Sequence, residues 1–256
     1  MRREIQGVRG RMERIPLLNT SIHNVDMDET IDYIESLAKA KKKSYVVPVN
    51  VDVVMRMEED AYLRSIAQAA DLVLADGKPL VWISRLNKQP LKGRITGSDL
   101  VPALCARAAE KGYTLFILGG KDGVAQSAKE RLEATYPGIQ VAGTYAPPFG
   151  FEKDEEELAH IREMISAVTP DFLIVCFGCP KQEKFIYENY QHYDATVSIC
   201  AGATVDFLAG NVKRAPKWMR DHGFEWLYRF LQEPKRLFKR YFIDDMKVFK
   251  LYFKYK

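Results

Sequence analysis

Short apolar runs alternate with helical or turn-like stretches through the first two hundred residues, and this alternation constrains the fold more than any other feature. The runs cover residues 45–49, 72–75, 113–118, 139–142, 172–177 and 196–201, and a helical stretch extends from the first of them to residue 69. Runs this short and this rich in Val, Ile and Leu are typical of strands buried on both faces of a parallel sheet. Repeated strand–helix units predict an α/β fold with a mostly parallel, Rossmann-like sheet and helices on both faces.

Two features precede the predicted sheet. Residues 12–25 hold two apolar pieces around Asn19 and predict a small hairpin. Asp26 and Asp28 form a D-x-D pattern, which in many sugar transferases holds a divalent metal on a diphosphate. However, Asp26 with Glu29 three residues later, followed by apolar residues at helical spacing, fits a capping box that opens an amphipathic helix to about residue 43. We therefore expect no metal at this pattern.

Composition and cysteine usage favour a cytoplasmic globular protein. The basic N-terminal residues lack an apolar core, and no run of about 18 apolar residues occurs in the chain, so we expect neither a secretory signal nor a membrane span. Cys105, Cys176, Cys179 and Cys200 lie in apolar surroundings, which suits reduced thiols. Cys176 and Cys179 form a C-x-x-C pattern without a second pair, so a zinc or redox site is disfavoured.

The stretch around residues 70–99 offers the first candidates for chemistry. Asp76 directly follows the run 72–75, which places a carboxylate at the end of a predicted strand, where open α/β sheets bind ligands. Arg94, Thr96, Gly97 and Ser98 then precede the next predicted helix, and a cation beside a helix N-terminus suits an anion. The simpler alternative is that Asp76 and Ser98 only cap the helices that follow them.

The other predicted strands also end in polar or glycine-rich residues. These ends hold Asn50 and Asp52, residues 119–123, residues 144–148, residues 178–183 and residues 202–206. Glycines between a strand and a helix let backbone N–H groups approach a phosphate, although tight turns use glycine for geometry alone. Polar ends on every strand favour a nucleotide-sized ligand along this edge of the sheet.

The strand–helix pattern stops near residue 210 and divides the chain into a predicted α/β catalytic domain, 12–210, and a helical C-terminal appendage, 211–256, called the tail below. Residues 213–256 carry a net charge of +8, whereas the rest of the chain carries −4, and the tail holds twelve of the 29 aromatic residues. Two helices are expected, one near 217–232 and one from Pro234. The tail could present a solvated basic face, an interfacial helix that meets anionic lipid, or a nucleic-acid site. The acidic remainder of the chain argues against nucleic acid.

Ordered motifs between residues 15 and 241 add a family resemblance. They are ADGKPLVWISR, RITGSDL, LFILGGKDG, FGCPKQEKFI and CAGATVDFLAGNVKRAPKWMRDHGFEWLYRFLQEPKRL. Together they resemble the WecG/TagA/CpsF glycosyltransferases. The resemblance implies an inverting transfer from a UDP-sugar to a polyprenyl-diphosphate-linked sugar at the inner face of the cell membrane, with no metal and no other cofactor. In the TagA branch, N-acetylmannosamine joins undecaprenyl-diphosphate-linked N-acetylglucosamine and forms the linkage unit of wall teichoic acid.

The resemblance also implies roles for single residues. Asp76 is expected to act as the general base on the acceptor hydroxyl, with Asn50 and Arg94 in the same pocket. Substrate contacts are expected from Thr96, Gly97, Gly119, Gly120, Tyr145, Gly178, Gln182 and Asp206, and from the tail arginines Arg214, Arg229, Arg236 and Arg240, which would meet diphosphate charge. Pro48 departs from the family pattern, in which a hydroxyl residue is expected two positions before the Asn.

Alternatives remain open at this point. The same family could use another donor, such as UDP-glucose or UDP-N-acetylmannosaminuronic acid. An NAD(P)-dependent oxidoreductase would share the alternating pattern, but the G-x-G-x-x-G spacing is missing after residues 113–118. A non-enzymatic lipid- or nucleic-acid-binding module would share the basic tail. The expected partners are a UDP-sugar, the lipid-linked acceptor, a membrane surface and, as a further candidate, a second copy of the chain, but not nucleic acid.

Overall fold

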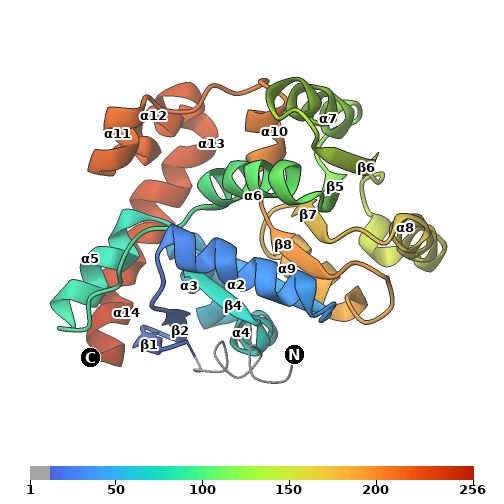
Figure 1. Cartoon of the computed structure of the whole chain (residues 1–256). Coiled ribbons are helices and arrows are strands. Elements are labelled where there is room, and N and C mark those ends of the chain that lie inside the picture. The colour runs from blue at the N-terminus through green and yellow to red at the C-terminus, as the bar shows by residue number, and fades with distance from the viewer. Residues whose placement is uncertain (1–11) are drawn as a thin grey trace.

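A parallel sheet forms the centre of the protein, whose computed structural model describes residues 12–256 apart from the side chains of Asp221 and Arg236. The sheet has six strands in the order β4-β3-β8-β7-β5-β6 (Figure 1). The strands are β3 (Ser44–Val49), β4 (Leu72–Ala75), β5 (Thr114–Gly119), β6 (Gln140–Tyr145), β7 (Phe172–Cys176) and β8 (Val197–Cys200). All neighbouring pairs are parallel, so the carboxyl ends of the strands share one edge, as the sequence predicts.

Helices cover both faces of this sheet. One face packs on α2 (Met27–Lys39), α6 (Gly97–Lys111), α7 (Val124–Thr135) and α10 (Thr204–Leu208). The other packs on the hairpin β1 (Arg14–Leu17) and β2 (Thr20–His23), and on α3 (Val51–Glu59), α4 (Ala61–Ala69), α5 (Lys78–Leu86), α8 (Glu155–Val168) and α9 (Lys181–Asn189). The short 3₁₀ turn η1 (Phe151–Lys153) precedes α8. Successive strand residues point to opposite faces, so Val46 belongs to one hydrophobic cluster and Val47 to the other.

The N-terminal predictions are confirmed, with differences at helix ends. β1 and β2 pair as an antiparallel hairpin. Asp26 accepts a hydrogen bond from the Glu29 N–H, and the Glu29 carboxylate accepts one from the Asp26 N–H, each at 2.9 Å, so the capping box opens α2. The helical stretch expected up to residue 69 breaks at Asp60, whose extended backbone lets its carboxylate cap α4 through the Leu63 N–H at 3.0 Å.

The tail folds into a chain of short helices. They are α11 (Lys217–His222), α12 (Glu225–Gln232), α13 (Pro234–Lys239), the π-helical turn η2 (Arg240–Asp244), the 3₁₀ turn η3 (Asp245–Lys247) and α14 (Val248–Tyr255). Pro234 is the first residue of α13, as expected. The single helix expected near 217–232 was wrong, because Gly223 at φ +84° adopts the left-handed conformation and ends α11. Among residues 12–256, no helix is long and apolar enough to cross a membrane.

The last helix packs on the body of the protein. Val248 and Leu251 belong to the same hydrophobic cluster as the side chains of α3, α4 and α9. The Tyr255 hydroxyl donates to Glu58 Oε2 at 3.0 Å, and Lys254 pairs with the same carboxylate at 2.5 Å. The end of the tail is therefore part of the hydrophobic core, while α11 and α12 lie at the upper left of Figure 1.

This packing predicts unequal effects of two substitutions in α14. Leu251 is 6% exposed and Phe253 is 74% exposed. Leu251→Ala is expected to lower the free energy of unfolding by about 2–5 kcal/mol, because it removes buried methyl groups and leaves a cavity. Phe253→Ala is expected to change it by about 0.5 kcal/mol or less. Denaturant unfolding of the two variants measures both values, and equal losses would contradict the packing of α14.

Candidate active site

The register of two neighbouring strands brings Asp76 and Asn50 together. Val49 at the end of β3 pairs with Ala75 at the end of β4. The next residues along the two strands, Asn50 and Asp76, are therefore neighbours. Asn50 Nδ2 donates to Asp76 Oδ2 at 3.3 Å, and its side-chain oxygen accepts from the Val53 N–H at 3.1 Å, which caps α3. The helix cap therefore also holds the amide against the carboxylate.

Asp76 and Ser98 do not cap the helices that follow them, so the simpler alternative was wrong. Gly77, at φ +122°, stands at the N-cap of α5, and no side chain makes a cap bond there. α6 is capped by Thr96, whose hydroxyl accepts from the Asp99 N–H at 3.1 Å. The Asp76 carboxylate is thus free of a cap role, and the cap predicted at Ser98 belongs two residues earlier.

The surroundings of Asp76 make its carboxylate more basic than usual. Burial raises the pKa of Asp76, and the hydrogen bond from Asn50 and the charge of Arg94 oppose the rise. The charge of Glu225 adds to this pKa rise, and that of Arg229 opposes it. A carboxylate whose pKa is raised holds a proton more tightly than an ordinary carboxylate, which suits a general base.

An ion-pair network beside Asp76 joins the body to the tail. Arg94 donates from Nη1 to Glu225 Oε2 at 2.8 Å and from Nη2 to Asp99 Oδ2 at 3.0 Å. Arg214 donates to Asp99 Oδ1 at 2.8 Å, and Arg220 lies 3.4 Å from the same oxygen. Three guanidinium groups on two carboxylates leave excess positive charge. Burial raises the pKa of Asp99, but Arg214, the hydrogen bond from Thr96 and the charge of Arg94 outweigh it and hold this pKa below its usual value.

The other predicted tail arginines lie at different places. Arg229 on α12 rests over the Phe207 ring at 5.7 Å, and its charge acts on Asp76. Arg240 lies against α3, where its Nη2 is 3.6 Å from Asp52 Oδ2. The side chain of Arg236 lies outside the described residues.

Gln182 connects the carboxyl ends of two strands near the middle of the sheet. Its Oε1 accepts from the Gly202 N–H at 2.9 Å and from the Gly178 N–H at 3.3 Å, while its Nε2 donates to Glu183 Oε1 at 2.9 Å. Gln182 and Glu183 are both buried. The structure therefore brings Gln182 and Gly178 together as a brace between the loops after β7 and β8.

Close packing explains three of the predicted glycines. A Cβ on Gly119 would lie 2.8 Å from the Cys176 carbonyl, and the φ angles of Gly119 and Gly120 are +112° and +87°. A Cβ on Gly97 would lie 3.2 Å from the Ala201 carbonyl oxygen. Gly119 and Gly120 thus suit their positions on geometric grounds whether or not a ligand binds, whereas a Cβ on Gly97 would only be tight against its neighbour. Asp206, on α10, follows the loop after β8.

Tyr145 lies far from Asp76. β6 and β4 are the two edge strands of the sheet, so five inter-strand steps of about 4.8 Å, roughly 24 Å in all, separate their ends. The Tyr145 hydroxyl donates to Glu157 Oε1 at 2.7 Å, and this bond raises the pKa of Tyr145 to about 12. Tyr145 and Asp76 do not share one pocket.

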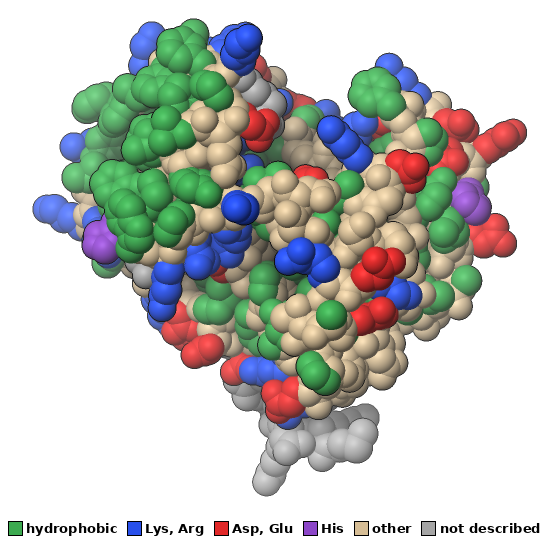
Figure 2. Space-filling model, turned by 90° about the horizontal axis from the view of Figure 1, so that it is seen from above, with side chains coloured by type: hydrophobic (Ala, Val, Ile, Leu, Met, Phe, Trp, Pro, Cys, Tyr) green, Lys and Arg blue, Asp and Glu red, His purple; other side chains and the backbone are tan. Residues whose placement is uncertain are grey.

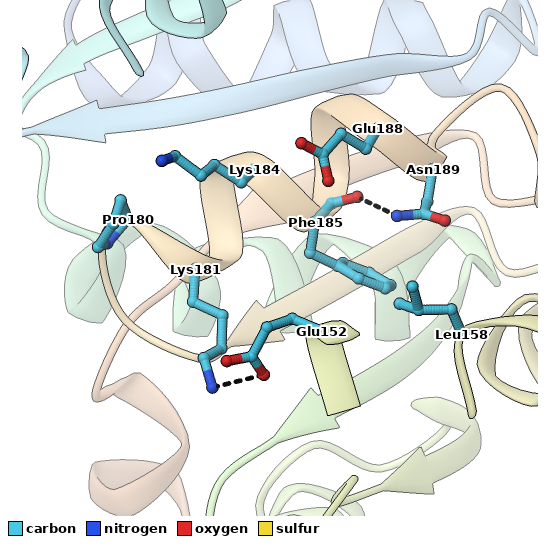
Figure 3. Close-up of a pocket in the computed structure, with 8 residues that line it drawn as sticks. All are labelled: Glu152, Leu158, Pro180, Lys181, Lys184, Phe185, Glu188 and Asn189. Carbon is cyan, nitrogen blue, oxygen red and sulfur yellow. Dashed lines mark hydrogen bonds and ion pairs between the residues drawn. The ribbon is translucent and has the colours of Figure 1, made fainter. Parts of the chain in front are cut away.

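A pocket of about 340 Å³ opens elsewhere, between α9, η1 and α8 (Figure 3). Its lining residues are Glu152, Leu158, Pro180, Lys181, Lys184, Phe185, Glu188 and Asn189. Phe185 forms its apolar part, and Lys181 spans its rim to Glu152 at 2.9 Å. None of the predicted site residues lines it.

Asp99, Arg220 and Glu225 are site residues that the sequence analysis missed. Asp99 is within the motif RITGSDL, five residues after Arg94. An acid this close to a predicted anion-binding arginine could have indicated that the two side chains pair. Glu225 and Arg220 meet Arg94 and Asp99 only because the tail folds back over the sheet edge, a contact across more than 120 residues.

The Asn50–Asp76 contact yields a testable prediction. In Asn50→Asp, the new carboxylate can still cap α3, but its charge opposes ionisation of Asp76. The pKa of Asp76 is expected to rise further, and the melting temperature near neutral pH is expected to fall with it, because ionised Asp76 then faces a second negative charge. Titration of the Asp76 carboxyl carbon by NMR measures this, with Asp60→Asn, a cap exchange in α4, as the control. An unchanged or lower pKa would contradict the contact.

Comparison with known proteins identifies the family of the chain. The model of the glycosyl transferase WecG/TagA/CpsF family matches residues 15–256. A Bacillus spizizenii protein named N-acetylglucosaminyldiphosphoundecaprenol N-acetyl-beta-D-mannosaminyltransferase is 30% identical over 226 residues, which cover 88% of this chain and 86% of the relative. A Bacillus subtilis protein of the same name is 33% identical over 223 residues, 84% of each chain. The chain therefore belongs to the WecG/TagA/CpsF family of glycosyltransferases.

Proposed function

We propose that the protein transfers N-acetylmannosamine from UDP-N-acetylmannosamine to undecaprenyl-diphosphate-linked N-acetylglucosamine. The observation that carries the proposal is the partly buried Asp76 carboxylate, bonded to Asn50 and flanked by Arg94 and Arg229 at the carboxyl edge of the sheet. The names of the two Bacillus relatives support this sugar and this acceptor. The product would be the linkage unit of wall teichoic acid or a related cell-surface polysaccharide.

Asp76 supplies the base in the proposed reaction. Its carboxylate takes the proton from the acceptor hydroxyl as the oxygen attacks the anomeric carbon of the donor. The bond from that carbon to the β-phosphate oxygen breaks, and UDP leaves from the opposite side, so the configuration inverts. Because its pKa is raised, Asp76 accepts the proton more favourably than a carboxylate with an ordinary pKa would.

Arginines neutralise the departing diphosphate in this proposal. Charge builds on the β-phosphate as UDP leaves, and preorganised guanidinium groups stabilise such charge without reorganisation. Arg94 and Arg214 are already fixed by Asp99 and Glu225, and Arg229 lies on the same side of the site. Gly119, Gly120 and Gln182 would then lie toward the nucleotide.

The tail would dock the enzyme on the inner face of the membrane, where the acceptor lipid resides. Trp226, Phe230, Phe238, Tyr241 and Phe242 contact one another through ring centroids 5.3–6.3 Å apart and form the tail aromatic cluster. Figure 2 shows hydrophobic side chains gathered at the upper left over the tail, with basic side chains nearby and a hollow beside them. Exposed aromatic residues with flanking cations suit the interface of an anionic membrane.

A transfer assay tests the proposal. Purified protein is incubated with UDP-N-acetylmannosamine and a short-chain polyprenyl-diphosphate-linked N-acetylglucosamine, and the disaccharide lipid and UDP are measured. UDP-glucose and UDP-N-acetylmannosaminuronic acid serve as alternative donors in parallel reactions. If product forms only with one of these alternative donors, that donor replaces UDP-N-acetylmannosamine in the proposal. If no UDP-sugar gives product, the proposal of a UDP-sugar transferase is rejected.

Asp76→Asn separates catalysis from binding. The amide cannot accept the proton, so kcat is expected to fall by about 10²–10⁴-fold, while UDP binds with nearly the parent affinity. Steady-state rates and calorimetric titration with UDP measure the two effects. Asp194→Asn, at an exposed position near the amino end of β8 and away from the site, is the matched control. Parent-like turnover in Asp76→Asn would reject the base assignment.

Membrane docking has its own test in the tail aromatic cluster. Phe238 and Phe242 stack at 5.3 Å and are 54% and 47% exposed, so replacing both with Ser removes apolar surface that faces the outside, and the melting temperature of the variant shows whether the tail stays folded. We expect the double variant to lose most of its binding to vesicles that contain anionic lipid, as measured by pelleting. Phe149→Ser, at a fully exposed Phe before η1 and outside the tail, should bind as the parent does. Equal binding by both variants would exclude the tail aromatic cluster as the docking surface.

A further inference from the structure

Helix α12 brings two opposite charges to the catalytic carboxylate. Glu225 and Arg229 are four residues apart, so they lie one turn apart on the same face of the helix. The charge of Glu225 raises the pKa of Asp76, and the charge of Arg229 lowers it. The neighbouring Trp226 and Leu231 are 41% and 68% exposed, so the helix presents apolar side chains to the outside.

Glu225 is the link between this helix and the body of the protein. Its Oε2 accepts from Arg94 at 2.8 Å, and its Oε1 lies 3.6 Å from Arg214. The Arg94 and Glu225 side chains are only 13% and 18% exposed, so little water screens their pair. The second bond of Arg94 goes to Asp99 on α6, so this guanidinium connects one carboxylate of the body with one of the tail.

We propose that Glu225 is a positioning residue that holds Arg94 between the body and the tail, beside Asp76 but not paired with it. The inference rests on the proposed role of Asp76 as the base, and it adds a residue through which docking of α12 would prepare that base for reaction.

The reason lies in the choice of partners open to Arg94. With Glu225 in place, both ends of the guanidinium are occupied by carboxylates other than Asp76. Without that charge, the Nη1 end loses its anionic partner, and the nearby Asp76 carboxylate becomes the alternative. A direct Arg94–Asp76 pair would stabilise the ionised base and weaken its attraction for the acceptor proton. Glu225 therefore holds Arg94 away from a direct pair with Asp76 and keeps Asp76 basic.

Two charge removals on the same helix face test the proposal. Glu225→Gln removes an anion, so the pKa of Asp76 is expected to fall by about one unit, as for a newly available opposite charge. Arg229→Gln removes a cation, so the pKa of Asp76 is expected to rise. A general loosening of α12 would instead admit water to Asp76 in both variants and move the pKa in the same direction. NMR titration of the Asp76 carboxyl carbon in the full chain measures these shifts without any substrate.

The pH dependence of kcat provides the second readout. In Glu225→Gln the acid limb is expected to move to lower pH and the plateau to fall, whereas a purely structural loss would lower the rate at every pH without moving the limb. Glu225→Asp, which keeps the charge, should restore the parent limb at least partly. Asp244→Asn, a tail carboxylate paired with Lys247 at 3.1 Å, is the control and should leave the profile unchanged.

The outcomes separate the two proposals. Opposite pKa shifts in the two variants support the role of Glu225 even if no sugar is transferred, in which case the proposed function alone fails. Equal or same-sign shifts overturn the role of Glu225, even if transfer by the parent protein is confirmed. Melting temperatures and tryptophan fluorescence of each variant show whether α12 remains folded.

Discussion

The burial of one carboxylate at the edge of a parallel sheet is the constraint on which the site depends. Removing an ionised Asp from water is costly, and proteins retain such a group only with hydrogen bonds and opposite charges around it. For Asp76 these come from Asn50, which the strand register places alongside, and from Arg94 and Arg229. The compensation is incomplete, so the pKa of Asp76 stays above its usual value, as the proposed role of a general base requires.

The tail contributes to this balance from the far end of the chain. Its inner face carries charges that reach the network around Asp99, whereas its outer face carries the tail aromatic cluster. The final helix is anchored in the core by Val248 and Leu251. One segment therefore combines a packed end, a charged face at the site and an apolar face toward the surroundings. A shift of this segment would change the contacts of all three parts.

Local patterns predicted the elements well, but not their arrangement. The apolar runs located all six strands of the sheet, because buried strands need continuous hydrophobic residues. The sequence predicted that Asp76 and Asn50 each follow a strand, but not that the two strands are neighbours. Strand order is not a local property, so the separation of Tyr145 from Asp76 could not be predicted from polar strand ends alone. The contacts of Glu225 depend on the return of the tail across the sheet edge, which no sequence period encodes, and the breaks at Asp60 and Gly223 reflect backbone conformations that helical periodicity conceals.

The brace formed by Gln182 has a consequence for the nucleotide that we propose to bind at this edge. Many α/β proteins bind phosphate through free backbone N–H groups in the loops that follow their strands. Here the side-chain oxygen of Gln182 already occupies the N–H groups of Gly178 and Gly202. In the proposed reaction, anion recognition would therefore depend less on these two main-chain groups and more on guanidinium groups that are partly open to solvent and subject to ionic screening. Affinity for a diphosphate in this protein should consequently weaken with rising salt more than it would in a backbone-lined phosphate loop.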